Sequence, residues 1–188
     1  TVLENGLMEE GGHYIALEIS NFQLVNIDRF RPEAAVILNL TPDHVDFMGS
    51  LDDYYKSKTE VYRNMSGSDL FLLNADDPVL AEYTAKYPVN CTVRTFSTDR
   101  SDTDSCVSGG YVCVNGEKVL PLDLIKIIGK HNLQNIIVAV SIAKAFGVTN
   151  EDICSVIADF RGVEHRIEFV RELNGVKYYN ASKGTSLN

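Results

Sequence analysis

The sequence predicts an α/β fold, with a mostly parallel sheet flanked by helices and a small antiparallel hairpin insert. Residues 34–40 form a short, continuous apolar run that is typical of a strand buried on both faces. A polar loop and a helix-like run over residues 50–65 follow, which together make half of a βαβ unit. Later, Asn115-Gly116 separates two short alternating segments, 111–114 and 117–120, and this dipeptide is a strong signal for a two-residue hairpin.

The other predicted elements continue this alternation. The predicted strands cover residues 14–19, 70–73 and 91–96, and the predicted helices cover residues 78–86, 133–146 and 150–160. Pro78 suits a first helical turn, Gly147 ends the second of these helices and Thr149 caps the third. Asn174-Gly175 predicts a second hairpin between residues 166–173 and 176–179, while residues 99–105 read as an exposed polar loop.

Composition limits the possible functions. The chain has 188 residues, 45% of them hydrophobic, which is enough for one ordinary core with a small appendage. A formal net charge of -9 argues against nucleic-acid binding and against adhesion to anionic membranes. No apolar window is long enough to span a bilayer. The four cysteines form no Cys-x-x-Cys pair, which favours a reduced cytoplasmic protein without a zinc site. The start has no signal-peptide pattern and no initiator Met, which suggests a piece of a longer protein.

Lys58 breaks the pattern of the helix predicted over residues 50–65. Ser50, with Asp53 three residues later, is a start signal of the capping-box type. Lys58 lies four residues after Tyr54 and four before Tyr62, so its stem falls on the apolar face of the helix. Burying a bare ammonium is costly unless it is paired or chemically changed. The ordinary alternative is that Lys58 reaches solvent past the tyrosines.

Polar residues follow the predicted strands at the places where ligands gather in α/β sheets. Asp43, His44 and Asp46 come directly after the strand at residues 34–40, and ligands bind beyond the carboxyl ends of such strands. An imidazole beside carboxylates can be a metal ligand, a general base or part of an ordinary surface loop. Glu18, near the end of the strand predicted over residues 14–19, either points into a site or is salt-bridged.

Four segments in chain order resemble the Mur ligase family of peptidoglycan enzymes. The segments are residues 17–24 (LEISNFQL), residues 39–46 (NLTPDHVD) with Lys58, residues 129–135 (GKHNLQN), and His165-Arg166-Ile167-Glu168 leading to residues 180–185 (NASKGT). The second segment is shared across the family. The other three most resemble the member that adds D-glutamate.

The resemblance implies a domain organisation and a reaction. Residues 1–162 would be most of a central ATP-binding domain, and residues 163–188 the start of a C-terminal domain. The parent protein would be an ADP-forming, cytoplasmic ligase of peptidoglycan synthesis that works together with further N- and C-terminal domains. It would phosphorylate the carboxylate of UDP-N-acetylmuramoyl-L-alanine with ATP, and the amine of D-glutamate would then attack the acyl phosphate.

The resemblance also implies roles for individual residues. Lys58 would be carbamylated and, with His44, would be catalytic and help to hold one Mg²⁺, while Glu18 would hold another. Hard oxygen ligands suit Mg²⁺. The nucleotide-side residues would be Asn132, Asn135, Arg166, Ser182, Lys183 and Thr185. The ordinary alternatives are a helix cap for Asn132 and a surface position for Arg166.

Two departures from the family pattern leave other functions open. The chain contains no G-x-x-x-x-G-K-[ST] loop, and Ala181 occupies the position of the family's usual aspartate. We therefore expect the isolated chain to be inactive in ligation. One alternative is another ligase of this type, adding diaminopimelate or lysine or related to folylpolyglutamate synthase. The other is a non-catalytic homologue that binds a nucleotide or a partner, which the presence of Glu18, His44 and Lys58 together disfavours.

Overall fold

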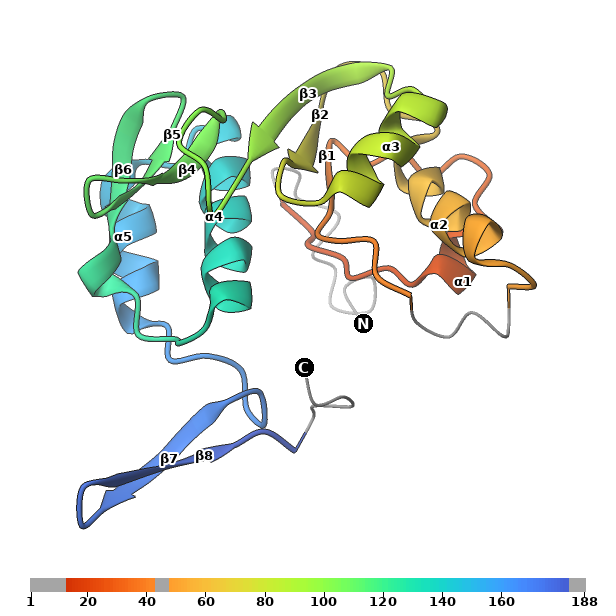
Figure 1. Cartoon of the computed structure of the whole chain (residues 1–188). Helices are drawn as coiled ribbons and strands as arrows, with labels where there is room; N and C mark the ends of the chain where they lie inside the picture. The colour runs from red at the N-terminus through yellow and green to blue at the C-terminus, as the bar shows by residue number, and fades with distance from the viewer. Residues whose placement is uncertain (1–12, 43–47, 183–188) are drawn as a thin grey trace.

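The fold is a six-stranded mixed sheet with helices on both faces. A computed structural model describes residues 13–42 and 48–182. The strands follow one another in chain order: β1 (Ala34–Ile37), β2 (Gly67–Asn74), β3 (Cys91–Phe96), β4 (Ser105–Ser108), β5 (Tyr111–Val114) and β6 (Glu117–Pro121). The pairs from β1 to β4 are parallel, and β4 to β6 form an antiparallel extension (Figure 1). This architecture confirms the predicted fold class.

The helices begin where local capping groups favour them. They are α1 (Asn21–Leu24), α2 (Leu51–Thr59), α3 (Pro78–Lys86), α4 (Lys130–Ala145) and α5 (Asn150–Asp159), with 3₁₀ turns η2 (Glu60–Tyr62) and η3 (Leu122–Leu124). Ser50 and Thr149 cap α2 and α5, as predicted. The helix α4 begins three residues before its predicted start, because Gly129 takes the N-cap position with a φ of 101°. No helix in the described ranges is long and apolar enough to cross a membrane.

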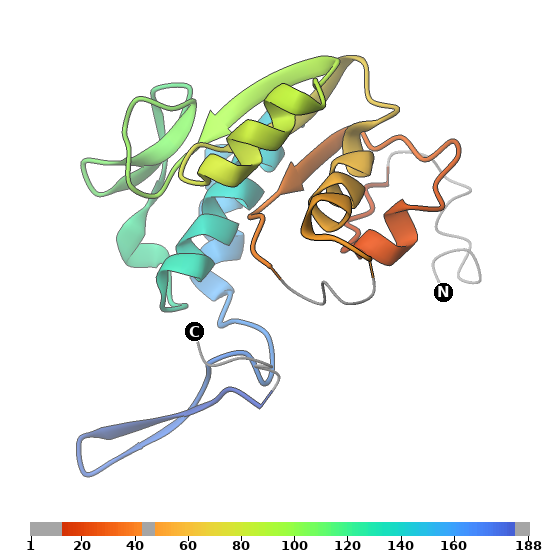
Figure 2. The same cartoon turned by 45° about the vertical axis from the view of Figure 1, so that its right-hand side comes forward.

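Alternate side chains of β2 point into two separate cores. Leu70 and Leu72 belong to a core shared with α4, α5 and the antiparallel strands. Phe71 lies between them in the sequence and is fully buried, but it belongs to a second core with α2 and α3. Figure 2 shows α2 and α3 on one side of the parallel strands and α4 on the other. A strand buried on both faces explains the continuous apolar run in the sequence.

Two tight turns shape the antiparallel extension. Asn115 and Gly116 have φ values of 51° and 80°, as the predicted hairpin requires. A second turn at Gly109 and Gly110, with φ values of 55° and 81°, joins β4 to β5 and was not predicted. The strand β4 was not predicted because the sequence around Ser105 is polar. The loop predicted over residues 99–105 ends at Ser105, which is the first residue of β4 and is buried.

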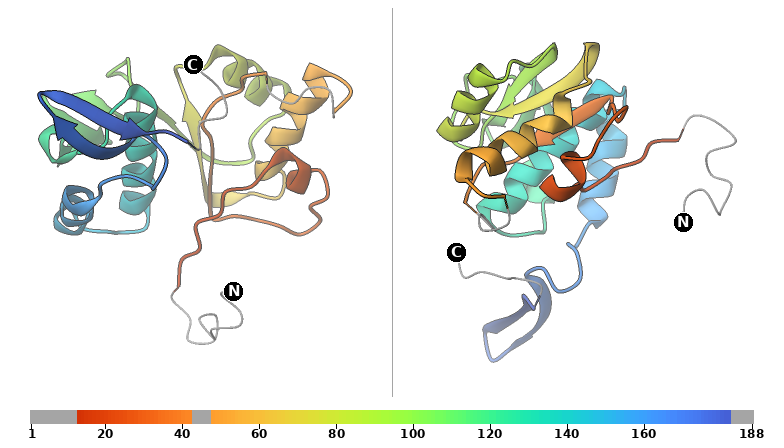
Figure 3. Two further views of the ribbon diagram at one scale, coloured as in Figure 1. Left: turned by 90° about the horizontal axis from the view of Figure 1, so that it is seen from below. Right: turned by 90° about the vertical axis from the view of Figure 1, so that its right-hand side faces the viewer.

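A separate hairpin follows α5. Its strands are β7 (Glu168–Leu173) and β8 (Val176–Asn180), and they form their own two-stranded sheet. The turn at Asn174-Gly175 confirms the predicted hairpin, although β7 begins two residues after the predicted start. Figures 1 and 3 show the hairpin projecting away from the α/β unit. Most of its residues are exposed on both faces.

The strand predicted over residues 14–19 is wrong. This segment is not a strand in the structure, and it leaves Tyr14 72% and Leu17 64% exposed. A strand needs a hydrogen-bonded neighbour, and within the described residues β1 pairs only with β2. The ring of Tyr14 instead contacts that of Phe146 edge-on, with centroids 5.1 Å apart.

Candidate functional site

The carboxyl ends of the parallel strands bring several polar segments to one edge of the sheet. The strands β1, β2 and β3 run in the same direction, so the segments that follow them, residues 38–42, 75–77 and 97–100, emerge at the same edge. Ligands of open α/β sheets bind at such an edge.

Three side chains hold the segment that follows β1. The carbonyl of Leu38 accepts from Nδ2 of Asn74 at 2.7 Å and from Nε2 of Gln134 at 3.0 Å. The amide of Leu40 donates to Oδ2 of Asp77 at 2.7 Å, and Oδ1 of the same carboxylate caps the first turn of α3. These bonds tie the segment to β2, α3 and α4, and none of the three side chains was predicted from the sequence to lie at the site. In the sequence, Asn74 and Asp77 are polar residues on either side of Ala75-Asp76 before Pro78, which is typical of a turn, and Gln134 is one polar residue of an expected helix.

A second, partly buried anchor joins the turn after β2 to the residues that follow β3. The Asp76 carboxylate accepts from the hydroxyl of Ser97 at 2.5 Å and from the amide and hydroxyl of Thr98. Burial acts to raise the pKa of Asp76, but these hydrogen bonds together outweigh it and lower that pKa. Nearby, Nζ of Lys130 at the start of α4 pairs with Asp99 at 2.6 Å. The edge therefore combines hydrogen-bonded carboxylates with the exposed, ion-paired cation of Lys130.

Lys58 lies on α2 as its spacing predicts. The residue is half-buried, and its Nζ lies 4.8 Å from the centroid of the Tyr54 ring. Among the described residues, it forms no ion pair. This geometry is a cation–π contact and fits the ordinary alternative, in which the lysine passes the tyrosines toward solvent. A carbamate at Lys58 stays a prediction.

The predicted magnesium ligands are only partly within the described residues. Glu18 is exposed, in the segment before α1. His44 lies outside the described residues, together with Asp43 and Asp46. No cluster of three or more candidate metal-binding side chains occurs in the described part of the chain.

The predicted nucleotide residues fall into two groups. Asn132 and Asn135 lie on the first turns of α4, and Asn135 is exposed. The N-cap of α4 is Gly129, so Asn132 is not the cap; its Nδ2 donates to the carbonyl of Ile128 at 2.7 Å instead. This bond leaves the amide oxygen of Asn132 as an acceptor for a ligand.

The second group lies at the base of the β7–β8 hairpin. His165 donates its backbone amide to Glu168 at 2.9 Å, and the Asn180 amide nitrogen lies 2.8 Å from the His165 ring. The amide of Ser182 donates to Asn180 at 3.1 Å. These bonds bring the His165-Arg166 segment beside the segment that begins at Asn180, and the Arg166 side chain is exposed. Lys183 and Thr185 lie outside the described residues.

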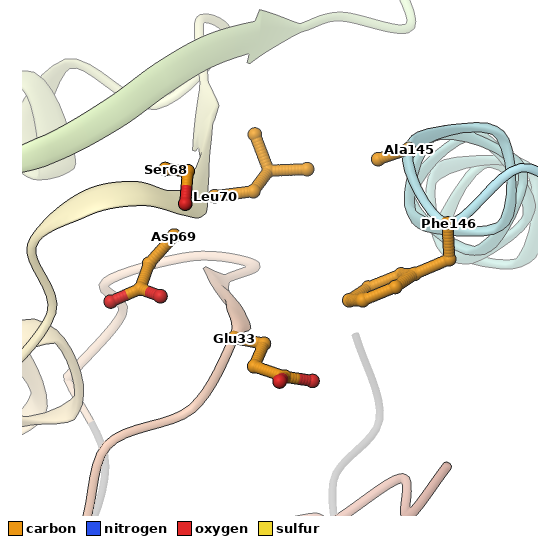
Figure 4. A pocket seen from close by; sticks show the side chains of 6 residues that line it. All are labelled: Glu33, Ser68, Asp69, Leu70, Ala145 and Phe146. Atoms are coloured by element: carbon orange, nitrogen blue, oxygen red, sulfur yellow. The ribbon is translucent and has the colours of Figure 1, made fainter. Parts of the chain in front are cut away.

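A pocket lies at the opposite edge of the sheet. Its lining residues are Glu33, Ser68, Asp69, Leu70, Ala145 and Phe146. Figure 4 shows Ala145 and Phe146, from the end of α4, across the hollow from the starts of β1 and β2. Asp69 is bound by Arg31 through two hydrogen bonds of 2.7 and 3.1 Å, which act with a backbone bond from Ser66 to lower its pKa. None of the predicted site residues lines this pocket.

Comparison with known proteins decides the family. Residues 4–143 match the Mur ligase middle domain. The chain belongs to this family. The UDP-N-acetylmuramoylalanine--D-glutamate ligase of Thermoanaerobacter pseudethanolicus is 40% identical over 180 residues, which are 93% of this chain and 39% of the relative. The ligase of the same name from Leuconostoc citreum is 38% identical over 173 residues, 92% of this chain and 38% of the relative.

Solved structures share the fold of this Mur ligase middle domain. A crystal structure of MurF from Acinetobacter baumannii superposes with a TM-score of 0.63 at 22% identity, covering 80% of this chain and 34% of that one. A crystal structure of the UDP-N-acetylmuramate-alanine ligase MurC from Thermotoga maritima gives 0.61 at 21% identity, covering 85% and 35%. The chain spans about two fifths of the length of the curated relatives it matches.

Proposed function

We propose that this Mur ligase middle domain is part of an ADP-forming ligase that adds D-glutamate to UDP-N-acetylmuramoyl-L-alanine in peptidoglycan synthesis. The observation that carries the proposal is the 40% identity, over 93% of this chain, to a relative named for D-glutamate ligation. In the reaction, ATP phosphorylates the alanyl carboxylate, and the amine of D-glutamate displaces phosphate from the acyl phosphate to form the amide.

The proposed domain division places residues 1–162 in the central domain and residues 163–188 at the start of the next. Two features support it. The helix α5 ends at Asp159, and the hairpin that follows forms a sheet of its own. A two-stranded hairpin is marginally stable by itself, so it needs a partner surface in the parent protein.

The proposed nucleotide contacts are divided between these parts. Asn132 and Asn135 would contact adenine from α4, because a side-chain amide can both donate to and accept from the base. Arg166, Ser182, Lys183 and Thr185 would lie on the phosphate and D-glutamate side. The guanidinium of Arg166 suits phosphate oxygens because its donors form a planar fork. Its exposure and its place at the base of the hairpin leave it accessible to a ligand.

Glu18, His44 and carbamylated Lys58 are the proposed magnesium ligands. Glu18, exposed in the segment before α1, would bind one Mg²⁺ through its carboxylate together with waters. The carbamate oxygens of Lys58 would bind a second Mg²⁺, with His44 as its ligand or neighbour. Bound Mg²⁺ would neutralise charge on the transferring phosphoryl group. Carbon dioxide would add to the amine of Lys58, which lies half-buried on α2 beside the Tyr54 ring.

Two features support the proposed cytoplasmic location and argue against a nucleic-acid partner. The four cysteines are free thiols, as expected for a reduced compartment. The net charge of -9 disfavours nucleic acid as a partner. We expect the remaining partners to be the further domains of the parent ligase.

Amino-acid preference tests the proposal. We would graft residues 1–188 in place of the matching segment of the Thermoanaerobacter relative and measure ADP release with UDP-N-acetylmuramoyl-L-alanine and each amino acid. The proposal expects release with D-glutamate and none with lysine or diaminopimelate. Release with another amino acid supports a different ligase of this family, and nucleotide binding without any release supports the non-catalytic homologue.

A further inference from the structure

The carbonyl of Leu38 has two side-chain donors from two different elements. Asn74 reaches it from the end of β2 at 2.7 Å, and Gln134 reaches it from α4 at 3.0 Å. The backbone ladder between β1 and β2 ends at Ile37 and Leu73, so neither bond belongs to it. The two amides therefore continue the bonding of the sheet one residue beyond its last backbone pair.

The two donors are not equivalent. Asn74 is buried, and its Oδ1 accepts from the amide of Asp76 at 2.9 Å, which directs its Nδ2 toward Leu38. Asn74 alone therefore gives the Leu38 carbonyl a partner, and folding does not require a second donor there. The bond from Gln134 adds a link between the turn after β1 and α4.

This link joins the two sides of the candidate site. Gln134 lies between Asn132 and Asn135 in the sequence of α4, and Leu38 leads into the exposed residues Asn39 and Thr41 at the carboxyl edge. We propose that Gln134 is a positioning residue, which fixes the spacing between the adenine side of the nucleotide site on α4 and the turn after β1. The identity of the ligand rests on the proposed function, whereas the bond itself does not.

Gln134→Met tests this role with little risk to the fold. Methionine has a similar length but donates no hydrogen bond, and Asn74 still satisfies the Leu38 carbonyl. In the 188-residue chain, we expect the amides of residues 39–41 to exchange with deuterium faster in this variant, with the melting temperature nearly unchanged. Glu82→Met, which places the same side chain at an exposed position on α3, is the matched control and leaves this exchange unchanged.

The grafted ligase described above separates positioning from folding. With Gln134→Met we expect kcat to fall about 10- to 100-fold, because misplaced reacting groups lower the rate, while the dissociation constant for ATP changes less than about twofold. Gln134→Glu gives a pH-dependent partial rescue, since a protonated carboxyl group can donate to Leu38 and a carboxylate cannot. A merely structural role would make the melting temperature rise and fall with kcat across the same pH range, whereas a positioning role leaves it nearly constant.

Each other outcome overturns the inference. Unchanged exchange at residues 39–41 contradicts the link, and faster exchange with unchanged kcat contradicts the positioning role. A fall in kcat that matches a fall in melting temperature shows a structural role alone. If the grafted wild-type ligase neither binds ATP nor releases ADP, the proposed function is wrong, and the positioning role of Gln134 is wrong with it. The hydrogen-exchange result needs no nucleotide, so it still shows whether the Gln134–Leu38 bond orders the turn after β1.

Discussion

The α/β unit and the β7–β8 hairpin both carry candidate site residues, but they differ in how they are held. The unit places Asn132, Asn135 and Lys58 on helices that cover buried strands. The hairpin carries Arg166 and Ser182 at its base and has apolar side chains exposed on both of its faces. Burying apolar surface is what stabilises a fold, so the unit has a core of its own and the hairpin does not.

This difference shows where the candidate site depends on the rest of a ligase. The turn after β1 is held from within the unit by Asn74, Asp77 and Gln134. In the part of the chain that the structure describes, a small group of polar contacts around Glu168 and Asn180 holds the base of the hairpin. We therefore expect one half of the site to be preformed in this chain and the other half to need further domains.

The largest expected effect comes from a matched pair of phenylalanines. Phe71 is fully buried and meets the Tyr62 ring with centroids 4.9 Å apart, while Phe169 is 53% exposed and meets the Tyr179 ring at 5.7 Å. We expect Phe71→Ala to lower the free energy of unfolding by about 3–5 kcal/mol, because it leaves a cavity in the core. Phe169→Ala should change it by less than about 0.5 kcal/mol. Denaturant titration followed by circular dichroism measures both, and similar losses would contradict the comparison.

Alkaline pH should weaken the unit through Tyr62. Burial raises the pKa of Tyr62 from its ordinary value of 10.0 to about 12. The pKa of Tyr62 is higher in the folded chain than in the unfolded one, so its neutral hydroxyl contributes to the free energy of unfolding. This contribution is fully present below pH 10 and is lost as the pH rises through about 12. We expect the loss between these values to be on the order of 1–3 kcal/mol, measured by denaturant titration across the pH range.

Tyr62→Phe is the control for that prediction. The variant loses the hydrogen bond from the Tyr62 hydroxyl to the carbonyl of Tyr87, at a cost of about 1 kcal/mol at neutral pH. It should also show a smaller loss of stability between pH 10 and 12 than the wild-type chain does. An equal alkaline loss in both proteins would assign that loss to other groups.

The two Asn-Gly turns give the smallest and most local test. Asn115 and Asn174 both have a φ of 51°, a left-handed conformation that asparagine tolerates better than alanine. We expect Asn115→Ala to lower the free energy of unfolding by about 1 kcal/mol, because its hairpin belongs to the main sheet. Asn174→Ala should leave the global unfolding transition in place and speed hydrogen exchange only in β7 and β8. A global loss with Asn174→Ala would show that the hairpin is part of the main cooperative unit.

The sequence predicted those parts of the fold whose signals are local. The apolar run before Asn39, the caps at Ser50 and Thr149, Pro78 and the two Asn-Gly turns all predicted elements that are present. The strand and the helix after it end earlier than predicted, at Ile37 and at Thr59, where a 3₁₀ turn follows. The strand predicted over residues 14–19 is wrong because apolar character cannot show whether a neighbouring strand is present. The short strand β4 was missed because its ends are polar serines.

The candidate site was predicted less completely, for a physical reason. Lys58 stood out because a cation on an apolar helix face breaks a periodic pattern. Asn74, Asp77 and Gln134 did not, because an amide or carboxylate in a turn or on a helix is ordinary until the fold brings it to a particular backbone group. Gln134 lies 96 residues from Leu38 in the chain, so only the packing of α4 beside β1 reveals their bond.

Substrate-dependent release of ADP by the purified 188-residue chain is the most direct test of this account. The chain would be incubated with ATP, Mg²⁺, UDP-N-acetylmuramoyl-L-alanine and D-glutamate, beside the grafted ligase as the positive control. The account predicts no substrate-dependent release from the isolated chain, because half of its candidate site lies on an unsupported hairpin and its sequence has no Gly-Lys-Thr or Gly-Lys-Ser loop for the phosphates. ADP release that requires both substrates and is lost in the Asn132→Ala variant would contradict it.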